Sequence, residues 1–233
     1  MNKLPPVIAI DGPSGVGKGT IGRLLAQNLN WHFLDSGALY RVLSLAAQQH
    51  DVALDNEQAL EVLAAHLDVQ FKTEKMGVRA RVILEGVDVT DVIRTELQGT
   101  AASKVSQFLG VRNALLNRQK DFRQAPGLVA EGRDMGTVVF PDAELKLFLI
   151  ASAEERAERR YRQLKEKGLN VKLADLVIEI AERDLRDQSR AVAPLKPAAD
   201  SVLLDTTGLN IDEVMIRVKA EVERKLGFEV VSL

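Results

Sequence analysis

A glycine-rich run ending in a lysine has the composition and spacing of a phosphate-binding loop. Its residues are Gly12-Pro13-Ser14-Gly15-Val16-Gly17-Lys18-Gly19-Thr20. The glycines allow positive φ values and point successive N–H groups at phosphate oxygens, while Lys18 reaches the outer phosphates. An apolar strand before the run and an amphipathic helix after it are the context that such a loop requires. The alternative is a glycine turn that happens to precede a lysine.

The loop departs from the usual pattern at one position. Gly19 follows the lysine where Ser or Thr is usual, and Thr20 carries the hydroxyl. We expect Mg²⁺ to be held partly through waters and nucleotide oxygens, because this ion usually keeps several waters. No set of residues is predicted to hold a metal directly.

Arginines at helical spacing form a second group suited to phosphate. They are Arg156, Arg159 and Arg160 on one expected helix, and Arg183, Arg186 and Arg190, together with Asp187, on another. Planar guanidiniums match the charge on a phosphoryl group in transfer. The alternative is a solvated helix face with ion pairs such as Glu155–Arg159, which contribute only about 0.3–0.5 kcal/mol each. Beside a phosphate loop, a phosphate role is favoured.

The run from residue 131 to 141 is a third group, and it follows an expected core strand. Open α/β sheets bind ligands at the carboxyl ends of their strands. Gly132 and Gly136 permit close approach of backbone to ligand, and Arg133 and Asp134 bring opposite charges to one place. The alternative is a tight turn with a local ion pair.

Hydrophobic patterning predicts the elements that position these groups. Apolar runs at 7–10, 31–35, 128–130, 145–150 and 202–204 are expected to be strands of a parallel sheet. Helices are expected after the loop, from a cap at Ser36 to 49, and at 57–65, 97–122, 152–167, 173–190 and 211–226. Alternation at 69–72 and 78–84, around a turn at Gly77, predicts a small antiparallel insertion. The fold class is therefore α/β.

Composition limits the settings in which the protein can act. The 233 residues suffice for one sizeable domain with an insertion, and the net charge of -2 argues against a nucleic-acid or membrane-surface binder. The chain has no cysteine, which excludes disulfides and thiolate chemistry. No apolar stretch reaches the length of a membrane span, so we expect a cytoplasmic protein.

Other classes of phosphate-loop protein lack their markers here. A regulatory GTPase should show an Asn-Lys-x-Asp segment late in the chain, and a motor or AAA-type ATPase a Walker-B acidic pair; neither is present. A kinase of the same fold acting on AMP, UMP or shikimate stays open as an alternative, as does a non-enzymatic nucleotide-binding module.

The chain resembles bacterial cytidylate kinases over nearly its whole length. The resemblance is carried by four runs, which are 10–15 (Ile-Asp-Gly-Pro-Ser-Gly), 34–41 (Leu-Asp-Ser-Gly-Ala-Leu-Tyr-Arg), 132–141 (Gly-Arg-Asp-Met-Gly-Thr-Val-Val-Phe-Pro) and 183–195. It implies transfer of the γ-phosphoryl group of ATP, with Mg²⁺, to CMP or dCMP. It also implies a P-loop kinase core with a five-stranded parallel sheet at 1–66 and 97–233, a helical lid at about 154–170, and an acceptor-binding insertion at 67–96. A monomer without nucleic-acid or membrane partners is expected.

The resemblance also implies roles for individual residues. The ATP phosphates would lie on Gly12 through Thr20, with Lys18 on the transferring group. The acceptor site would comprise Arg41, Arg133 and Arg190 at the phosphate, Ser36, Arg112 and Asp134 at the cytosine, and Ser103, Arg183 and Asp187 near the ribose, with Tyr40 as a further substrate-binding residue. Arg156, Arg159 and Arg160 would belong to the lid and act in catalysis with Lys18 and Arg133. A buried carboxylate such as Asp134 accepts from the cytosine amino group and repels the uracil oxygen, which can discriminate by roughly 10⁴.

Overall fold

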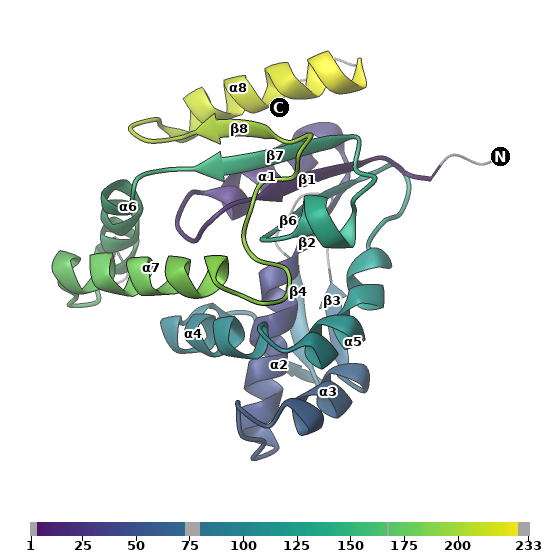
Figure 1. Cartoon of the computed structure of the whole chain (residues 1–233), viewed down its shortest axis with the longest axis vertical. Helices are drawn as coiled ribbons and strands as arrows, with labels where there is room; N and C mark the ends of the chain where they lie inside the picture. The colour runs from purple at the N-terminus through teal and green to yellow at the C-terminus, as the bar shows by residue number, and fades with distance from the viewer. Residues whose placement is uncertain (1–3, 73–79, 167, 228–233) are drawn as a thin grey trace.

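A five-stranded parallel sheet forms the centre of the molecule (Figure 1). The computed structural model describes residues 4–72, 80–166 and 168–227. The strands are β1 (Val7–Asp11), β2 (His32–Asp35), β6 (Leu128–Gly132), β7 (Leu145–Ile150) and β8 (Val202–Asp205), in the spatial order β2-β6-β1-β7-β8. All neighbouring strands pair in parallel. The predicted α/β fold and its five core strands are confirmed.

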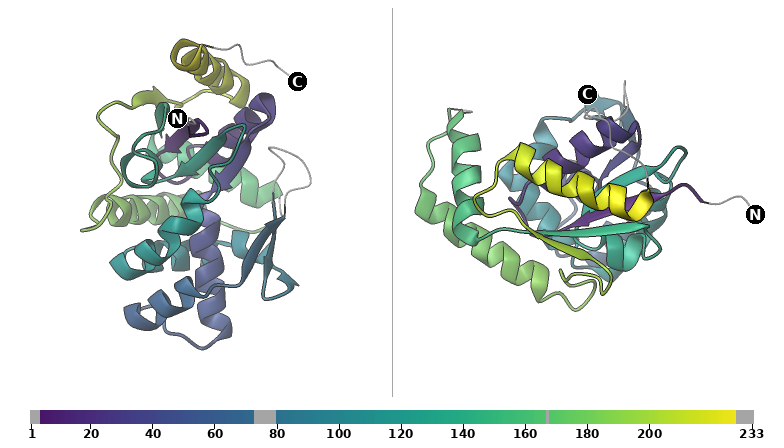
Figure 2. Two further views of the ribbon diagram at one scale, coloured as in Figure 1. Left: turned by 90° about the vertical axis from the view of Figure 1, so that its right-hand side faces the viewer. Right: turned by 90° about the horizontal axis from the view of Figure 1, so that it is seen from above.

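Helices cover both faces of this sheet, because its central strand is apolar on both sides. In β1, Ile8 and Ile10 belong to one core cluster, and Val7 and Ala9 belong to another. Alternation of side chains along the strand produces this division. The helices concerned are α1 (Lys18–Leu29) and α8 (Ile211–Leu226) on one face and α2 (Ser36–Gln49) on the other. Figure 2 shows α8 and α2 at opposite ends of the molecule.

The chain between β2 and β6 forms a second body, drawn below the sheet in Figure 1. After α2 it contains α3 (Glu57–Ala65), β3 (Val69–Lys72), β4 (Arg81–Leu84), β5 (Val87–Asp88), η1 (Val92–Arg94), α4 (Glu96–Val105) and α5 (Leu109–Lys120). The predicted antiparallel pairing is found, with Val69 opposite Leu84, and β5 is a third strand that was not predicted. The predicted turn at Gly77 lies outside the described residues. The helical spacing at 97–122 corresponds to two helices, α4 and α5.

An arm of two helices projects from the carboxyl end of β7. It consists of α6 (Ala153–Glu166) and α7 (Leu173–Gln188), which pack on each other through Ala157, Leu164, Leu176 and Ile180. This small cluster is separate from the two clusters that flank the sheet. The prediction that Arg190 lies on the same helix face as Arg183 and Asp187 is wrong, because α7 ends at Gln188. The chain then turns back, and the Leu195 N–H donates to the Asp187 carbonyl at 2.8 Å.

Candidate active site

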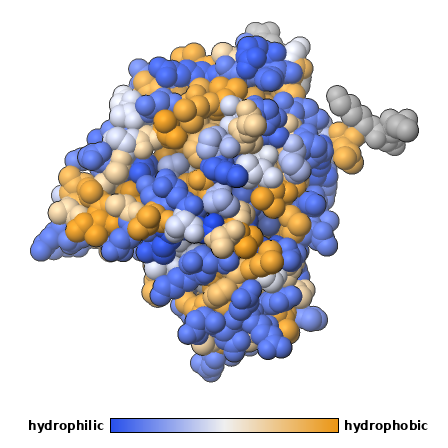
Figure 3. Space-filling model, in the orientation of Figure 1, coloured by the Kyte–Doolittle hydropathy of each residue, from blue (hydrophilic) through white to orange (hydrophobic). Residues whose placement is uncertain are grey.

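A large cavity opens at the carboxyl ends of the strands, between the sheet, the second body and the arm. Its volume of about 1740 Å³ exceeds the roughly 300–1,000 Å³ of a typical site for one small ligand. In the space-filling view, hydrophilic side chains gather where the arm meets the body (Figure 3). The lining includes residues 14 to 20 and the predicted Ser36, Tyr40, Arg41, Ser103, Arg112, Arg133, Asp134, Arg159, Arg160, Arg183, Asp187 and Arg190. Of the predicted site residues, all of which are described, Gly12, Pro13 and Arg156 are not part of this lining.

The phosphate loop joins β1 to α1 at one end of the cavity. Gly12 has φ +148°, and a Cβ there would lie 2.2 Å from the Leu149 carbonyl oxygen, so only glycine fits. Lys18 is the first residue of α1, and its ammonium donates to the Pro13 carbonyl at 2.6 Å. Burial and, next, the positive charge of Arg133 lower the pKa of Lys18 to about 7. A bound anion would favour the charged lysine, as expected of a phosphate site.

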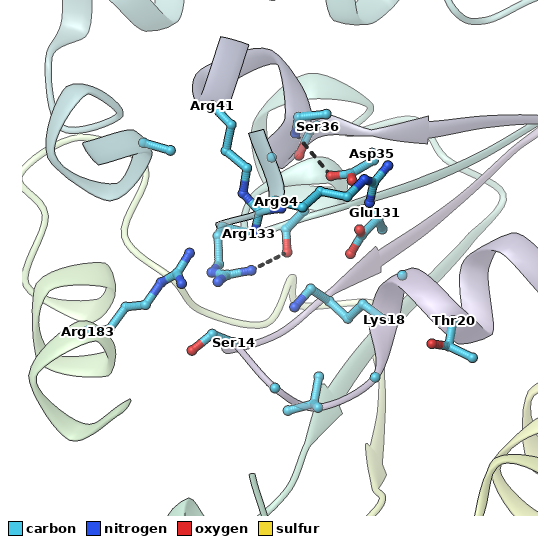
Figure 4. Close-up of a pocket in the computed structure, with 18 of the residues that line it drawn as sticks. Ser14, Lys18, Thr20, Asp35, Ser36, Arg41, Arg94, Glu131, Arg133 and Arg183 are labelled. Carbon is cyan, nitrogen blue, oxygen red and sulfur yellow. Dashed lines mark hydrogen bonds between the residues drawn. The ribbon is translucent and has the colours of Figure 1, made fainter. Parts of the chain in front are cut away.

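Two carboxylates that the sequence reasoning missed lie beside this loop (Figure 4). Asp35 ends β2, and Glu131 lies directly opposite it in β6. Burial and, next, the charge of Asp35 raise the pKa of Glu131 to about 7, so the pair favours a nearby cation. Both residues stand at the carboxyl ends of predicted core strands, which is the signal that could have identified them.

The start of α2 differs from the prediction that Ser36 caps the helix. Asp35 is the capping residue, and its carboxylate accepts a hydrogen bond from the Ala38 N–H at 3.1 Å. Asp35 has extended backbone angles, as a cap requires, whereas Ser36 is already the first residue of the helix. The cap therefore fixes the position of one of the two carboxylates beside the loop.

Four arginines surround another part of the cavity, and we call them the arginine cluster: Arg41 on α2, Arg133 after β6, Arg183 on α7 and Arg190 after α7. Asp187 is only 1% exposed and accepts hydrogen bonds from Arg133 Nε at 2.7 Å and from Arg190. Burial raises the pKa of Asp187, but Arg133 and Arg190 outweigh it, so the pKa lies below its usual value. Burial and, next, Arg133 lower the pKa of Arg183 to about 9. The cluster holds an excess of positive charge that an anion would offset.

A third part of the cavity combines a buried ion pair with an aromatic ring. Arg112 donates to Asp134, and both side chains are buried. The Arg112 guanidinium lies 5.9 Å from the centroid of the Tyr40 ring. Because Asp134 pairs with Arg112, and Arg133 with another carboxylate, the alternative of a local ion pair between Arg133 and Asp134 is wrong. The Ser103 hydroxyl is buried without a hydrogen-bond partner among the described residues.

Asp11 connects the phosphate loop to the part of the cavity that holds the Arg112–Asp134 ion pair. The sequence did not indicate this connection. It is the last residue of β1, and its carboxylate accepts hydrogen bonds from the N–H groups of Met135 at 2.9 Å and Gly136 at 2.8 Å. These amides begin a π-helical turn, η2 (Met135–Val139), directly after Asp134. Burial is the main cause that raises the pKa of Asp11 to about 6.

Arg156 ties the arm to the phosphate loop from outside the cavity. Its guanidinium donates to both carboxylate oxygens of Asp184 on α7, at 3.0 and 2.5 Å. A third bond, at 3.2 Å, goes to the Ser14 carbonyl in the loop. The Arg156 guanidinium is therefore hydrogen-bonded both to α7 and to the phosphate loop.

Arg159 and Arg160 lie one turn further along α6 and point to different elements. Arg159 donates to the Thr206 carbonyl after β8 at 2.6 Å and to Glu155 on its own helix at 2.8 Å. Arg160 forms an ion pair with Glu96 at the start of α4. The arm thus contacts the loop after β8 through one arginine and the second body through the other.

Known proteins with similar sequences were found over nearly the whole chain. Residues 8–224 match the family model described as cytidylate kinase. The chain is 61% identical over 227 residues to a cytidylate kinase of Aeromonas hydrophila, covering 97% of this chain and 98% of that protein. It is 60% identical over 230 residues to a cytidylate kinase of Pseudomonas aeruginosa, covering 99% of this chain and 100% of that protein.

Proposed function

The chain belongs to the cytidylate kinase family, and we propose how its cavity transfers the γ-phosphoryl group of ATP to CMP. One observation carries the proposal. A single cavity is lined by the phosphate loop, the arginine cluster and the Arg112–Asp134 pair. This arrangement can accept two anionic nucleotides whose phosphates meet between Lys18 and the cluster. The same cavity would take dCMP.

The donor phosphates bind to the loop of residues 12 to 20, where backbone N–H groups and the N-terminus of α1 attract anions. Lys18 contacts the group being transferred. Its lowered pKa, about 7, supports this role, because a neighbouring phosphate compensates for the burial of the ammonium.

Magnesium fits the oxygen groups beside the loop. Thr20, Asp35 and Glu131 offer a hydroxyl and two carboxylates, which are the hard oxygen ligands that this ion prefers. The raised pKa of Glu131, with its cause in burial and in Asp35, supports a cation there. When bound, the ion would offset the negative charge of the donor phosphates. Among the described residues no group of three or more His, Cys, Asp or Glu could hold a metal alone, so the nucleotide would complete its coordination.

The acceptor phosphate binds to Arg41, Arg133 and Arg190. Asp187 holds two of these guanidiniums in place before the ligand arrives, which lowers the entropy lost on binding. The ribose of the acceptor is contacted by Arg183, Asp187 and Ser103. The buried Ser103 hydroxyl, which lacks a partner among the described residues, supports a ligand contact.

Asp134 and Arg112 recognise the base. The Asp134 carboxylate accepts from the exocyclic amino group of cytosine, and Arg112 donates to the ring acceptors, with Ser36 and Tyr40 beside them. Uracil presents a carbonyl oxygen where cytosine presents the amino group, so it would face the carboxylate without a proton between them.

The reaction is a direct in-line transfer. The bond between the γ-phosphorus and its bridging oxygen breaks while an oxygen of the CMP phosphate bonds to that phosphorus. The acceptor phosphate is already largely a dianion at neutral pH, since its second pKa is about 6, so no general base is needed. Lys18 and the arginine cluster stabilise the charge of the moving group.

The lid over the two nucleotides lies at about residues 154–170, within the arm of α6 and α7, and the 67–96 insertion serves the acceptor side. The separate hydrophobic cluster of the arm supports movement as a unit. Arg159 and Arg160 line the cavity and would follow the arm toward the phosphates, whereas Arg156 would position the loop. Closure excludes water that would otherwise hydrolyse ATP.

The enzyme acts in the cytoplasm as a monomer. None of the helices in the described ranges has the length and apolar character to cross a bilayer.

A coupled assay with ATP, Mg²⁺ and each nucleoside monophosphate tests the proposed function. Turnover is expected with CMP and dCMP and far less with UMP or AMP. The Lys18→Ala variant should lose roughly 10³-fold or more in kcat while keeping the thermal unfolding midpoint of the wild type within a few degrees. Near-normal turnover in this variant, or equal rates with all acceptors, would contradict the proposal.

A further inference from the structure

A smaller cavity of about 670 Å³ lies between the arm and the start of α4. Figure 1 shows α4 alongside the arm. The two cavities share part of their lining, including Arg41, Glu96, Arg160 and Gln163. Arg160 therefore stands at a boundary, and rotation of its side chain between staggered positions can carry the guanidinium from one cavity to the other.

The contacts of Arg160 hold it at the edge of α4. Its guanidinium forms an ion pair with Glu96 and donates to Gln163 Oε1 at 3.2 Å. Glu96 is the first residue of α4, where the helix dipole favours a carboxylate. The second body thus offers Arg160 an anion that is not a nucleotide.

The charge of Arg41 acts on Arg160 from the other side. Burial and, next, the positive charge of Arg41 lower the pKa of Arg160, whereas the carboxylate of Glu179 on α7 has the opposite effect. Arg41 belongs to the arginine cluster that is proposed to hold the acceptor phosphate. A phosphate bound there would attract Arg160, which in its absence is repelled.

The ion pair is weak enough to be replaced by such a phosphate. The Arg160 side chain is 25% exposed and that of Glu96 is 48% exposed, and pairs in contact with water contribute little to stability. Hydrogen bonds from a guanidinium to a phosphate, which can form in pairs, are stronger. Glu96 can therefore hold Arg160 in the free enzyme and lose it to a bound nucleotide.

We infer that Glu96 is a positioning residue that competes with the nucleotide phosphates for Arg160, so that Arg160 reaches them chiefly when the acceptor is bound. The inference rests on the proposed function, which places the acceptor phosphate at Arg41. Without CMP, water can attack the γ-phosphorus, and the bond to the bridging oxygen breaks to give ADP, phosphate and a proton. Arg160 held by Glu96 withholds a stabilising cation from this side reaction.

Replacing Glu96 by glutamine removes the competing charge and keeps the size of the side chain. ATP hydrolysis without CMP should rise by roughly twofold to fivefold. A fivefold change equals about 1 kcal/mol at 1.36 kcal/mol per tenfold, which is the upper value for an exposed ion pair. The affinity for CMP, titrated calorimetrically beside a non-hydrolysable ATP analogue, should rise by a similar factor, because CMP no longer displaces Glu96. A merely structural role of Glu96 would lower this affinity.

Two further variants separate this effect from others. The matched control is Glu57→Gln, since Glu57 is the exposed first residue of α3 and is not among the described residues that line either cavity. It should change neither hydrolysis nor CMP affinity. In an Arg160→Met background, Glu96→Gln should have no additional effect, because the cation for which Glu96 competes is gone.

The inference is overturned if hydrolysis or CMP affinity is unchanged in Glu96→Gln, if CMP affinity falls, or if the same increases occur in the Arg160→Met background. Turnover of CMP by the wild type tests the proposed function separately. A wild type that phosphorylates CMP together with an inert Glu96→Gln change would contradict this inference alone, so the two failures are distinguishable.

Discussion

Buried carboxylates at the site mainly hold other groups in position. Asp187 contacts two arginines, and Asp11 receives two backbone amides. Asp134 differs, because its carboxylate pairs with a single cation, Arg112. A carboxylate with one protein partner retains acceptor capacity for a ligand. This difference supports Asp134 as the group that reads the base.

Replacing Asp134 by asparagine tests this assignment. The amide can donate to the uracil oxygen, so we expect kcat/KM to fall by roughly 10²–10³ with CMP and to fall less, or rise, with UMP. Both values come from the coupled assay, and Asp142→Asn, at a side chain that is 55% exposed, is the control. Equal losses with both acceptors would mean that Asp134 supports the site without reading the base.

Replacing Asp11 by asparagine should change how the stability of the ligand-free enzyme depends on pH. Its pKa is raised from 3.8 to about 6, so in ligand-free wild type its contribution to stability is full below about pH 4 and is lost as pH rises through 6. The Asp11→Asn variant has no such loss, so its stability relative to wild type should rise by about 2 kcal/mol from pH 4.5 to 7.5, in addition to a pH-independent cost of leaving one amide without an acceptor. Urea unfolding at pH 4.5 and 7.5 measures this difference.

The same variant should bind CMP less well, because an asparagine side chain has one oxygen and can accept from only one of the two amides of Met135 and Gly136. We expect a rise of roughly tenfold in KM for CMP and little change in KM for ATP. A pH-independent stability difference, or equal changes in both KM values, would contradict this account.

At the scale of elements, the arm is connected to the rest of the molecule chiefly by charged contacts. Its own apolar cluster joins α6 to α7, while Arg156 links Asp184 on α7 to the phosphate loop. Polar links of this kind can break and reform without exposing a hydrophobic core. Movement of the arm, as proposed for the lid, would therefore break polar contacts and leave the two clusters that flank the sheet intact.

Asp184→Asn should loosen this connection. Arg156 is buried and would lose its charged partner, so the guanidinium would hold the Ser14 carbonyl less firmly. We expect kcat for CMP to fall about tenfold and the rate of ATP hydrolysis relative to transfer to rise, because closure excludes water less well. Glu182→Gln, on the same helix, is the control, since Glu182 is exposed and lies 3.7 Å from Arg186. Unchanged partition between transfer and hydrolysis would refute the role of this link.

For the whole molecule, charge is distributed unevenly despite a net charge of only -2. The arginine cluster concentrates cations at one place, and burial together with Arg133 lowers the pKa of Arg183 to about 9. The ligand-free enzyme is consequently less stable than its packing alone would allow, and anionic substrates remove this destabilisation.

Arg183→Met should raise the thermal unfolding midpoint of the ligand-free enzyme by a few degrees at pH 7. A folded-state pKa below the normal value means that the charged form destabilises the fold, so removing the charge is stabilising. The increase in midpoint on adding 1 mM CMP should be smaller than in wild type. Arg217→Met, at an exposed position on α8, should change neither quantity. A lower ligand-free midpoint in Arg183→Met would contradict this view.

Much of the fold and the type of site were predictable from the sequence. The five core strands, the phosphate loop and the resemblance to cytidylate kinases depend on short runs, in which periodicity and glycine positions determine local backbone geometry. Gly12 illustrates this, because its φ of +148° and the neighbouring Leu149 carbonyl exclude any side chain.

Only the tertiary structure decided which charges meet. Arg133 does not pair with its neighbour Asp134 but with Asp187, 54 residues away. Asp134 pairs instead with Arg112, 22 residues away. The strand register that places Asp35 beside Glu131, and the end of α7 before Arg190, were likewise not predictable from spacing. The physical reason is that the strength of an ion pair depends on distance and burial in space. Sequence separation fixes neither quantity once the chain has folded.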